Sequence, residues 1–197
     1  MRASRLLLVC TLALAVVRPL AAPGQQPLAQ DPPAPIVDLT PEERRDYNRG
    51  LAEARSLMAE GQWGRATARL DGLIAARPRE AQARFLKGVV QSEAGETDGA
   101  IATFRALIDD YPEIPEPYNN LAVMYGRRGE IEAARTALLT AIKTAPDWAV
   151  AHENLGDVYA QLAVDHYQRA QTLDRANKTA PAKLKLAREL LAAGATR

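Results

Sequence analysis

Cysteine and aromatic residues are scarce in this sequence. Only one of the 197 residues is a cysteine, Cys10, and 5% are aromatic, whereas 47% are hydrophobic. Because Cys10 lies in an apolar run near the start, the rest of the chain can form neither a disulfide bond nor a thiolate metal site. Runs of the strand formers Val, Ile and Thr are also few. Alanine and leucine carry the hydrophobicity and both favour helices, so we expect an all-α chain that depends on helix packing for its stability.

A block of like charge is also missing, and the formal net charge of the whole chain is +1. The first 24 residues hold Arg2, Arg5 and Arg18 and no acidic residue, so 22 basic and 24 acidic side chains follow them. A slightly acidic chain in which the two signs are interspersed gives no electrostatic reason for nucleic-acid binding. We therefore expect no nucleic-acid partner.

Residues 1–24 have the pattern of a secretory signal peptide. A short basic start precedes twelve apolar residues at 6–17, and small residues at Ala22 and Gly24 favour cleavage after Gly24. Twelve residues span about 18 Å as a helix, against roughly 30 Å for the hydrocarbon core of a membrane. We therefore predict an exported, periplasmic protein. In the alternative, the signal stays uncleaved and residues 6–17 anchor the chain to the membrane.

Residues 25–40 are rich in glutamine and proline and form a predicted linker. Its prolines, at positions 27, 32, 33 and 35, disfavour a helix. A helix is expected to begin directly afterwards. Thr40 supplies a capping hydroxyl, Pro41 fits the first turn, and Glu43 lies at the third helical position.

A 34-residue period is the strongest pattern in the chain. Four columns keep one residue type over three units: Gly61, Gly95 and Gly129; Ala66, Ala100 and Ala134; Ile74, Ile108 and Ile142; and Pro78, Pro112 and Pro146. Glycine permits the positive φ of a tight turn, alanine lets two helices approach closely, and proline ends the second helix. The period predicts paired helices near 41–59, 63–77, 81–94, 97–110, 115–128 and 131–144.

These columns resemble the tetratricopeptide repeat, whose pattern is W-x2-L-G-x2-Y, then A-x3-F, then P. The third unit carries most of the pattern, in Tyr118, Leu121, Tyr125, Ala134, Leu138 and Pro146. Glu53, Lys87 and Gln91 depart from it. The resemblance implies a right-handed α-α superhelix over residues 41–175, with repeats at 47–80, 81–114 and 115–148 and a degenerate fourth at 149–174.

The fourth unit is too short for a second helix and has no glycine to mark a turn. Apolar residues instead recur at three-to-four spacing through it, which predicts one long helix near 148–174. A short distorted turn near Ala163 is the alternative. Residues 176–197 form a predicted final helix and tail, with the helix ended by Gly194. The four leucines expected to cap the open end of the stack are Leu184, Leu186, Leu190 and Leu191.

No pattern indicates catalysis. The chain has no Gly-rich phosphate loop and no G-x-S-x-G, and the stretch from His152 to Gly156 lacks the second histidine of a zinc-protease motif. His166 would lie about 21 Å from His152 along one helix, too far for a shared metal. His152 occupies a column of large aromatics, which favours a packing role. We predict no catalytic residue, metal or cofactor.

The resemblance also implies a concave groove that is lined by the first helix of each pair and binds a protein or peptide. In the family, asparagines at the positions of Asn120 and Asn154 often contact the ligand backbone. The family's terminal-carboxylate clamp is not present here. The groove residues implied for this chain are Arg55, Phe85, Val89, Asn119, Asn120, Val123, Arg127, Glu153, Asn154 and Asp157.

Three functional hypotheses follow. The first is an exported adaptor or scaffold that binds proteins through this groove, in envelope assembly for example. The second is a structural protein that self-associates through the long helix or the leucine-rich end. The third is an accessory domain of an enzyme.

Overall fold

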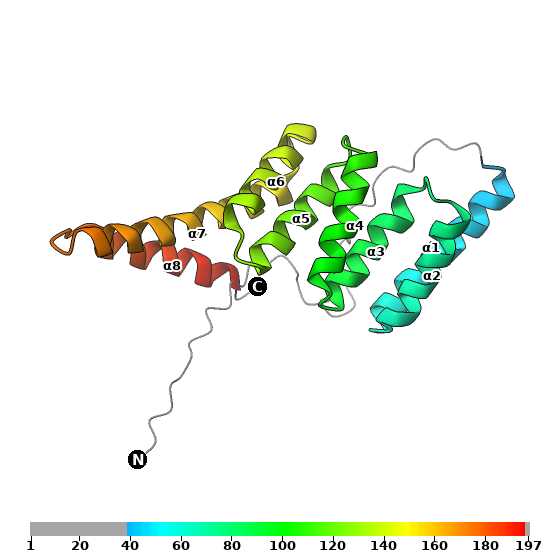
Figure 1. The fold of residues 1–197 in the computed structure, drawn as a ribbon, viewed down its shortest axis with the longest axis horizontal. Helices are drawn as coiled ribbons and strands as arrows, with labels where there is room; N and C mark the ends of the chain where they lie inside the picture. Colours follow the sequence, from blue (N-terminus) through cyan, green and yellow to red (C-terminus); the bar gives the residue numbers. More distant parts are fainter. Residues whose placement is uncertain (1–38, 196–197) are drawn as a thin grey trace, which may run out of the picture.

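The computed structural model describes residues 39–195, and every regular element in this range is an α-helix (Figure 1). The predicted signal peptide and most of the predicted linker lie outside the described residues. The helices are α1 (Pro41–Ala59), α2 (Trp63–Ala76), α3 (Ala81–Glu93), α4 (Thr97–Asp110), α5 (Pro115–Arg127), α6 (Ile131–Thr144), α7 (Ala149–Leu173) and α8 (Ala180–Ala195). The all-α prediction is confirmed, and each predicted helix boundary agrees to within two residues.

The helices form an elongated row in which each one packs chiefly against the helices before and after it (Figure 1). The pairs α1–α2, α3–α4 and α5–α6 make up the stack, and α7 and α8 form a hairpin at its far end. The odd-numbered helices α1, α3, α5 and α7 are the first members of their units. The face they share is therefore where the groove was predicted.

The start of α1 has the predicted cap. The Thr40 hydroxyl accepts a hydrogen bond from the backbone N–H of Glu43 at 3.2 Å, and the Glu43 carboxylate accepts one from the Thr40 N–H at 3.0 Å. The Thr40 N–H and the Thr40 hydroxyl, which donates to the same carboxylate at 2.9 Å, lower the pKa of Glu43 below its ordinary value, with a contribution from Arg77. The capping box therefore fixes where the stack begins.

The columns of the repeat have the roles that their residue types predict. Gly61, Gly95 and Gly129 end their turns with φ values of 69°, 82° and 75°, a region that glycine enters at little cost. The alanines that follow each glycine by five residues are fully buried between helices. The prolines come two residues after the last residue of α2, α4 and α6.

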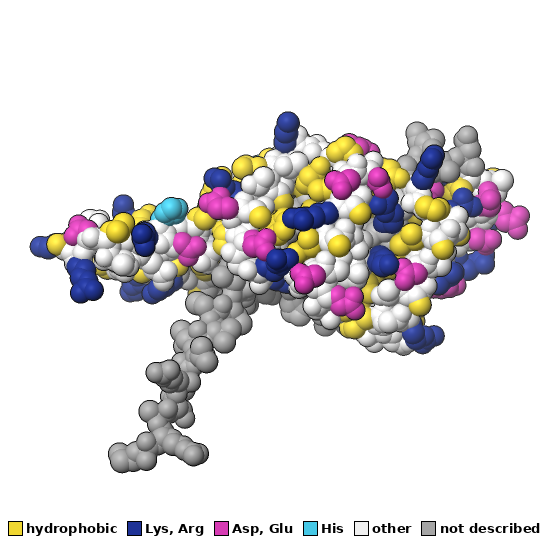
Figure 2. Space-filling model, viewed as in Figure 1, with side chains coloured by type: hydrophobic (Ala, Val, Ile, Leu, Met, Phe, Trp, Pro, Cys, Tyr) yellow, Lys and Arg dark blue, Asp and Glu magenta, His cyan; other side chains and the backbone are white. Residues whose placement is uncertain are grey.

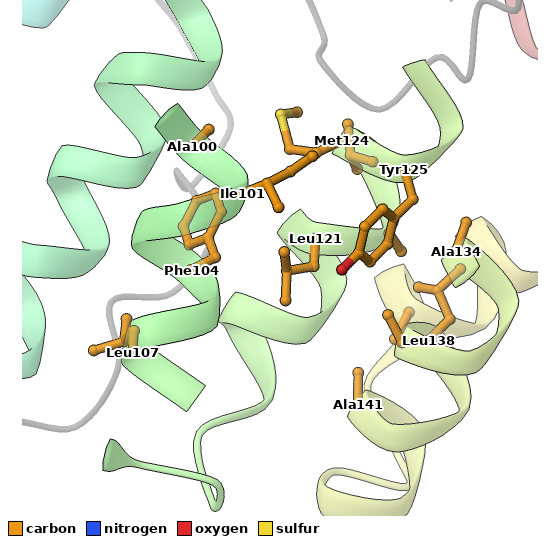
Figure 3. Packing of buried hydrophobic residues seen from close by; sticks show 14 of the residues in the cluster. Ala100, Ile101, Phe104, Leu107, Leu121, Met124, Tyr125, Ala134, Leu138 and Ala141 are labelled. Atoms are coloured by element: carbon orange, nitrogen blue, oxygen red, sulfur yellow. The ribbon is translucent and has the colours of Figure 1, made fainter. Parts of the chain in front are cut away.

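Each pair buries a small residue of its first helix and a large residue of its second at equivalent positions of the repeat. These are Ala54 and Leu70, Gly88 and Phe104, and Ala122 and Leu138. A Cβ atom added to Gly88 would lie 2.5 Å from the Phe104 ring. Side chains of α4, α5 and α6 then meet in one continuous core (Figure 3). The small residue thus sets how closely the two helices of a pair approach.

The fourth unit contains one uninterrupted helix, as predicted, since α7 runs for 25 residues through Ala163. Ala163 stands 34 residues after Gly129, in the column of the turn glycines. An alanine resists the left-handed conformation that the turn needs, so the helix continues. The alternative of a turn near Ala163 is wrong.

The final helix differs from its prediction in two respects. It continues through Gly194 to Ala195, so the glycine does not end it. It packs along α7 with Leu184 buried and Leu191 partly buried, whereas Leu186 and Leu190 are exposed. Two of the four expected capping leucines therefore cover nothing within the described residues.

The small-residue column allows a matched test with two glycines. Gly88→Ala should lower the free energy of unfolding by about 1–3 kcal/mol, because the buried Phe104 ring has no room to move away. Gly156, two repeats further on, has no atom within 4 Å of an added Cβ. Gly156→Ala should therefore stabilise the protein by up to about 1 kcal/mol, through the higher helix propensity of alanine. Urea unfolding measures both, and equal effects would contradict the packing described.

Candidate functional site

The predicted groove residues all lie on α1, α3, α5 and α7, and we call the surface they share the odd-helix face. Two of its columns keep the 34-residue spacing: Arg55, Val89, Val123 and Asp157 in one, and Glu93, Arg127 and Gln161 in the other. Equivalent turns of successive helices therefore place these residues in rows that run along the stack.

Phe85 is not part of the surface. Its side chain is 1% exposed, and its ring packs against Phe104 with the ring centroids 5.8 Å apart. A ligand on the odd-helix face cannot reach it without unfolding α3 from α4. The assignment of Phe85 to the groove is therefore corrected to the core, and Val123, which is 5% exposed, is also largely covered.

Asn119 and Asn154 bind each other. The Asn154 amide donates a 2.7 Å hydrogen bond to the Asn119 side-chain oxygen, and both side chains are buried. The bond links α5 to α7, so each asparagine helps to align neighbouring repeats. Asn120 is half-buried and donates from Nδ2 to the Glu116 carbonyl at 2.9 Å. The expected contact with a ligand backbone therefore suits Asn120 better than the buried Asn154.

Arg127 links α5 to α3. Its Nη1 atom donates to the Ser92 carbonyl at 2.9 Å and lies 3.4 Å from the Ser92 hydroxyl. Burial raises the pKa of the neighbouring Glu93, and the positive charge of Arg127 opposes that rise. Arg127 remains exposed overall, so it both joins two repeats and presents positive charge at the surface.

A third link joins α1 to α3. The Tyr47 hydroxyl accepts a 3.1 Å hydrogen bond from the Ala83 backbone N–H, one of the donors that the first turn of α3 leaves unpaired. Burial raises the pKa of Tyr47 to about 12, so its hydroxyl stays protonated at neutral pH. The sequence pattern did not identify Tyr47 or Ser92, because neither belongs to a column of the repeat.

Two carboxylates lie together on α7. Burial raises the pKa of Asp157, and the negative charge of Glu153, four residues earlier on the same helix, raises it further. Glu153 is exposed and Asp157 is half-buried. A positively charged group placed here would relieve both the repulsion and the burial cost.

The accessible residues of the odd-helix face are therefore a subset of those predicted. They are half-buried or exposed, and they comprise Arg55, Val89, Asn120, Arg127, Glu153 and Asp157. Positive charge lies on α1 and α5, and negative charge on α7. This arrangement suits recognition of an extended chain with alternating chemistry, and it contains no nucleophile paired with a base.

His152 is exposed, so the expected packing role is wrong. A hydrogen bond of 2.7 Å joins its Nε2 atom to the Pro146 carbonyl. Tyr118, one repeat earlier, makes the same contact through its hydroxyl with Pro112. The two residues thus share a role in fixing the loops before α5 and α7.

The described part of the chain holds no group of three or more His, Cys, Asp or Glu side chains arranged to bind a metal ion. Nor does any helix between residues 39 and 195 have both the length and the apolar character needed to cross a membrane.

Comparison with known families supports the repeat pattern. A family model described as tetratricopeptide repeat matches residues 51–115, and a second with the same description matches residues 115–147. A comparison with curated proteins found no match.

Several solved structures have a similar fold. The TPR domain of Sgt2 from Aspergillus fumigatus has a TM-score of 0.58 and 13% identity, over 64% of this chain and 83% of that one. The first TPR of Spaghetti (RPAP3), bound to the HSP90 peptide SRMEEVD, has a TM-score of 0.56 and 11% identity, over 60% of this chain and 94% of that one. The type III secretion chaperone SycD of Yersinia enterocolitica, in complex with a peptide of the translocator YopD, has a TM-score of 0.55 and 13% identity. The match covers 62% of this chain and 98% of that one. At these identities the similarity concerns the fold.

Asp157→Asn should stabilise the protein at pH 7 and leave it unchanged at pH 3. Because the folded state raises the pKa of Asp157, the wild-type protein loses stability as the pH rises from the ordinary value of 3.8 through the folded value. The variant lacks this loss. Relief of like charges four residues apart on a helix amounts to a few tenths of a kcal/mol. Thermal unfolding at the two pH values measures it, and an equal or lower stability of the variant at pH 7 would refute the repulsion.

Proposed function

The chain belongs to the tetratricopeptide repeat family and folds as its all-α superhelix, and on this premise we propose that it is an exported adaptor that binds a protein ligand on the odd-helix face. The single observation that carries the proposal is the set of charged side chains on that face. Arg127 is tied to Ser92 of α3, and burial together with the exposed Glu153 raises the pKa of Asp157. Such groups suit a ligand that supplies the opposite charge.

The three links between odd helices support the proposal. The contacts of Tyr47, Arg127 and Asn154 join α1 to α3, α3 to α5, and α5 to α7. A face fixed in this way loses little conformational freedom when it binds, which favours affinity for a flexible peptide. The link between Asn119 and Asn154 buries two side chains that the resemblance placed in the groove, so recognition depends on the residues that stay accessible, including Arg127.

The ligand that fits has three features. A positive group would lie beside Glu153 and Asp157, an acceptor or carboxylate would lie beside Arg127, and a small apolar group would contact Val89. The structures of Spaghetti and SycD contain bound peptides, which supports the same mode of recognition in this chain.

We also propose that the protein is exported, on the basis of the sequence of residues 1–24. Expressed in a Gram-negative host, the protein should be recovered from the periplasm with an intact mass that lacks residues 1–24. The reason is the basic start, short apolar run and small-residue cleavage site. A full-length chain in the membrane fraction would support the uncleaved anchor instead, and a full-length chain in the cytoplasm would refute export.

Binding is tested with variants in which neutral amide side chains of nearly equal size replace carboxylates. A chain with Glu153→Gln and Asp157→Asn should lose at least about tenfold in affinity for the proteins captured by the tagged wild type from envelope extract, as expected when a ligand cation loses its carboxylates. The control carries Asp98→Asn and Glu132→Gln, which change the net charge equally on the even helices α4 and α6.

The control should capture as the wild type does, because its two carboxylates make only exposed ion pairs. Equal capture by all three proteins would refute the odd-helix face as the binding surface. Phe85 is unsuitable for this test, since its truncation would open the core.

A further inference from the structure

The α7–α8 hairpin stands apart from the stack. Its second half has a small core of its own, formed by Val164, Leu184 and Ala187 with Tyr167 and Leu191 around them. In Figure 1 this hairpin projects away from α6 at the end of the row. Its surface is therefore available to a partner without displacing any other helix.

The outer part of the hairpin, from residue 166 onward, carries a charge opposite to that of the rest of the described chain. Residues 166–195 have six Lys and Arg side chains and two acidic ones, whereas residues 39–165, which include the start of α7, have 15 basic and 20 acidic. Figure 2 shows the blue side chains gathered around the free end of the hairpin. The six basic residues are Arg169, Arg175, Lys178, Lys183, Lys185 and Arg188.

The hairpin also exposes large apolar side chains. Leu173, Leu186 and Leu190 are 72%, 64% and 60% exposed. No other large hydrophobic side chain of the described residues is as exposed. An isolated exposed leucine is ordinary in a soluble protein, but three on one short hairpin form a patch that indicates a contact.

The three leucines lie on one side of the hairpin. Lys183 of α8 reaches over the ring of Tyr167 on that side, with its Nζ atom 5.8 Å from the ring centroid. Leu186 and Leu190 follow Lys183 by three and seven residues, which keeps them on its side of α8. At about 100° per residue, Leu173 lies roughly 120° around α7 from Tyr167 and roughly 160° from Gln171, which lines the opposite side. We call this side the leucine face.

The opposite side of the hairpin carries charged side chains. It holds a shallow depression lined by Gln171, Pro181, Leu184, Lys185, Arg188, Glu189 and Ala192. The turn between the helices is ordered, because the Asn177 side-chain oxygen accepts hydrogen bonds from the N–H groups of Thr179 and Ala180 at 3.0 and 2.9 Å. The hairpin is therefore amphipathic across its width, with basic residues at its tip.

We propose that the leucine face binds the surface of an anionic phospholipid membrane. Leucines that enter the boundary between headgroups and acyl chains, with Lys and Arg beside them, are the combination by which a helix lies on such a surface. The charge selects anionic lipids, since each basic residue near the surface adds to the attraction. The acidic stack is repelled by the same lipids and stays in solution.

Charge also argues for a membrane over a second copy of the chain. Two hairpins that met through their leucine faces would bring two strongly basic segments together, and like charges across an interface oppose association. The lipid surface supplies both an apolar layer and negative charge. This surface is separate from the odd-helix face, so a protein ligand and a membrane can be bound together.

The test uses the chain from Gln25 onward, which keeps all described residues and omits the apolar run at 6–17. Vesicles of phosphatidylglycerol mixed with phosphatidylcholine should bind it in cosedimentation, and vesicles of phosphatidylcholine alone should bind at least tenfold less. The triple variant Leu173→Gln, Leu186→Gln and Leu190→Gln should bind the anionic vesicles about 100-fold less, because its three side chains no longer insert into the apolar layer. Arg169→Gln with Lys178→Gln should weaken binding and reduce its salt dependence.

Leu139→Gln is the matched control, because Leu139 is an exposed leucine of α6 outside the hairpin. It should bind vesicles as the wild type does, and the triple variant should keep its helicity and its protein capture. Unchanged vesicle binding by the triple variant, or no preference for anionic lipid, would overturn the proposal. A wild-type sedimentation mass that rises with concentration and falls to one chain in the triple variant would assign the leucine face to self-association instead.

Discussion

The close approach of two helices at one small residue governs the architecture of this protein. Each pair brings a glycine or alanine of its first helix against a leucine or phenylalanine of its second, and the distance between helices follows from that pairing. The Phe104 ring occupies the space that a Cβ of Gly88 would need. With this spacing fixed, the turn glycines and prolines return the chain at the same angle in every unit, and the odd helices come into line.

The alignment of the odd helices determines what their shared face can bind. Tyr47, Arg127 and Asn154 bridge successive repeats, and of these three only Arg127 is also exposed at the surface. The accessible charged groups of the face are few, and each lies on a defined turn of its helix. Specificity in such a surface depends on the order of charges and apolar contacts along the ligand, because the backbone geometry of every repeat is nearly the same.

The fold could be predicted almost completely from the sequence, because the 34-residue columns report backbone conformation and packing within a pair. The long helix α7 was also predictable, since the glycine of the turn column is replaced by Ala163. The site was predicted less well. Spacing along one helix shows which residues share a side, but not which neighbour covers them. Phe85 and Asn154 were therefore assigned to the surface although Phe104 and Asn119 bury them, and Leu186 was assigned to a cap although nothing in the described fold covers it.

The row arrangement has a consequence for how the chain reaches its fold. Because each helix packs chiefly against its sequence neighbours, almost every tertiary contact closes a short loop. Short loops cost little entropy to close, so folding of this topology is fast and can start at any pair. The middle units have neighbours on both sides, so we expect them to open last and α1 and the hairpin to open first. Backbone amide hydrogens should then exchange slowly in the middle of the array and fast at its two ends.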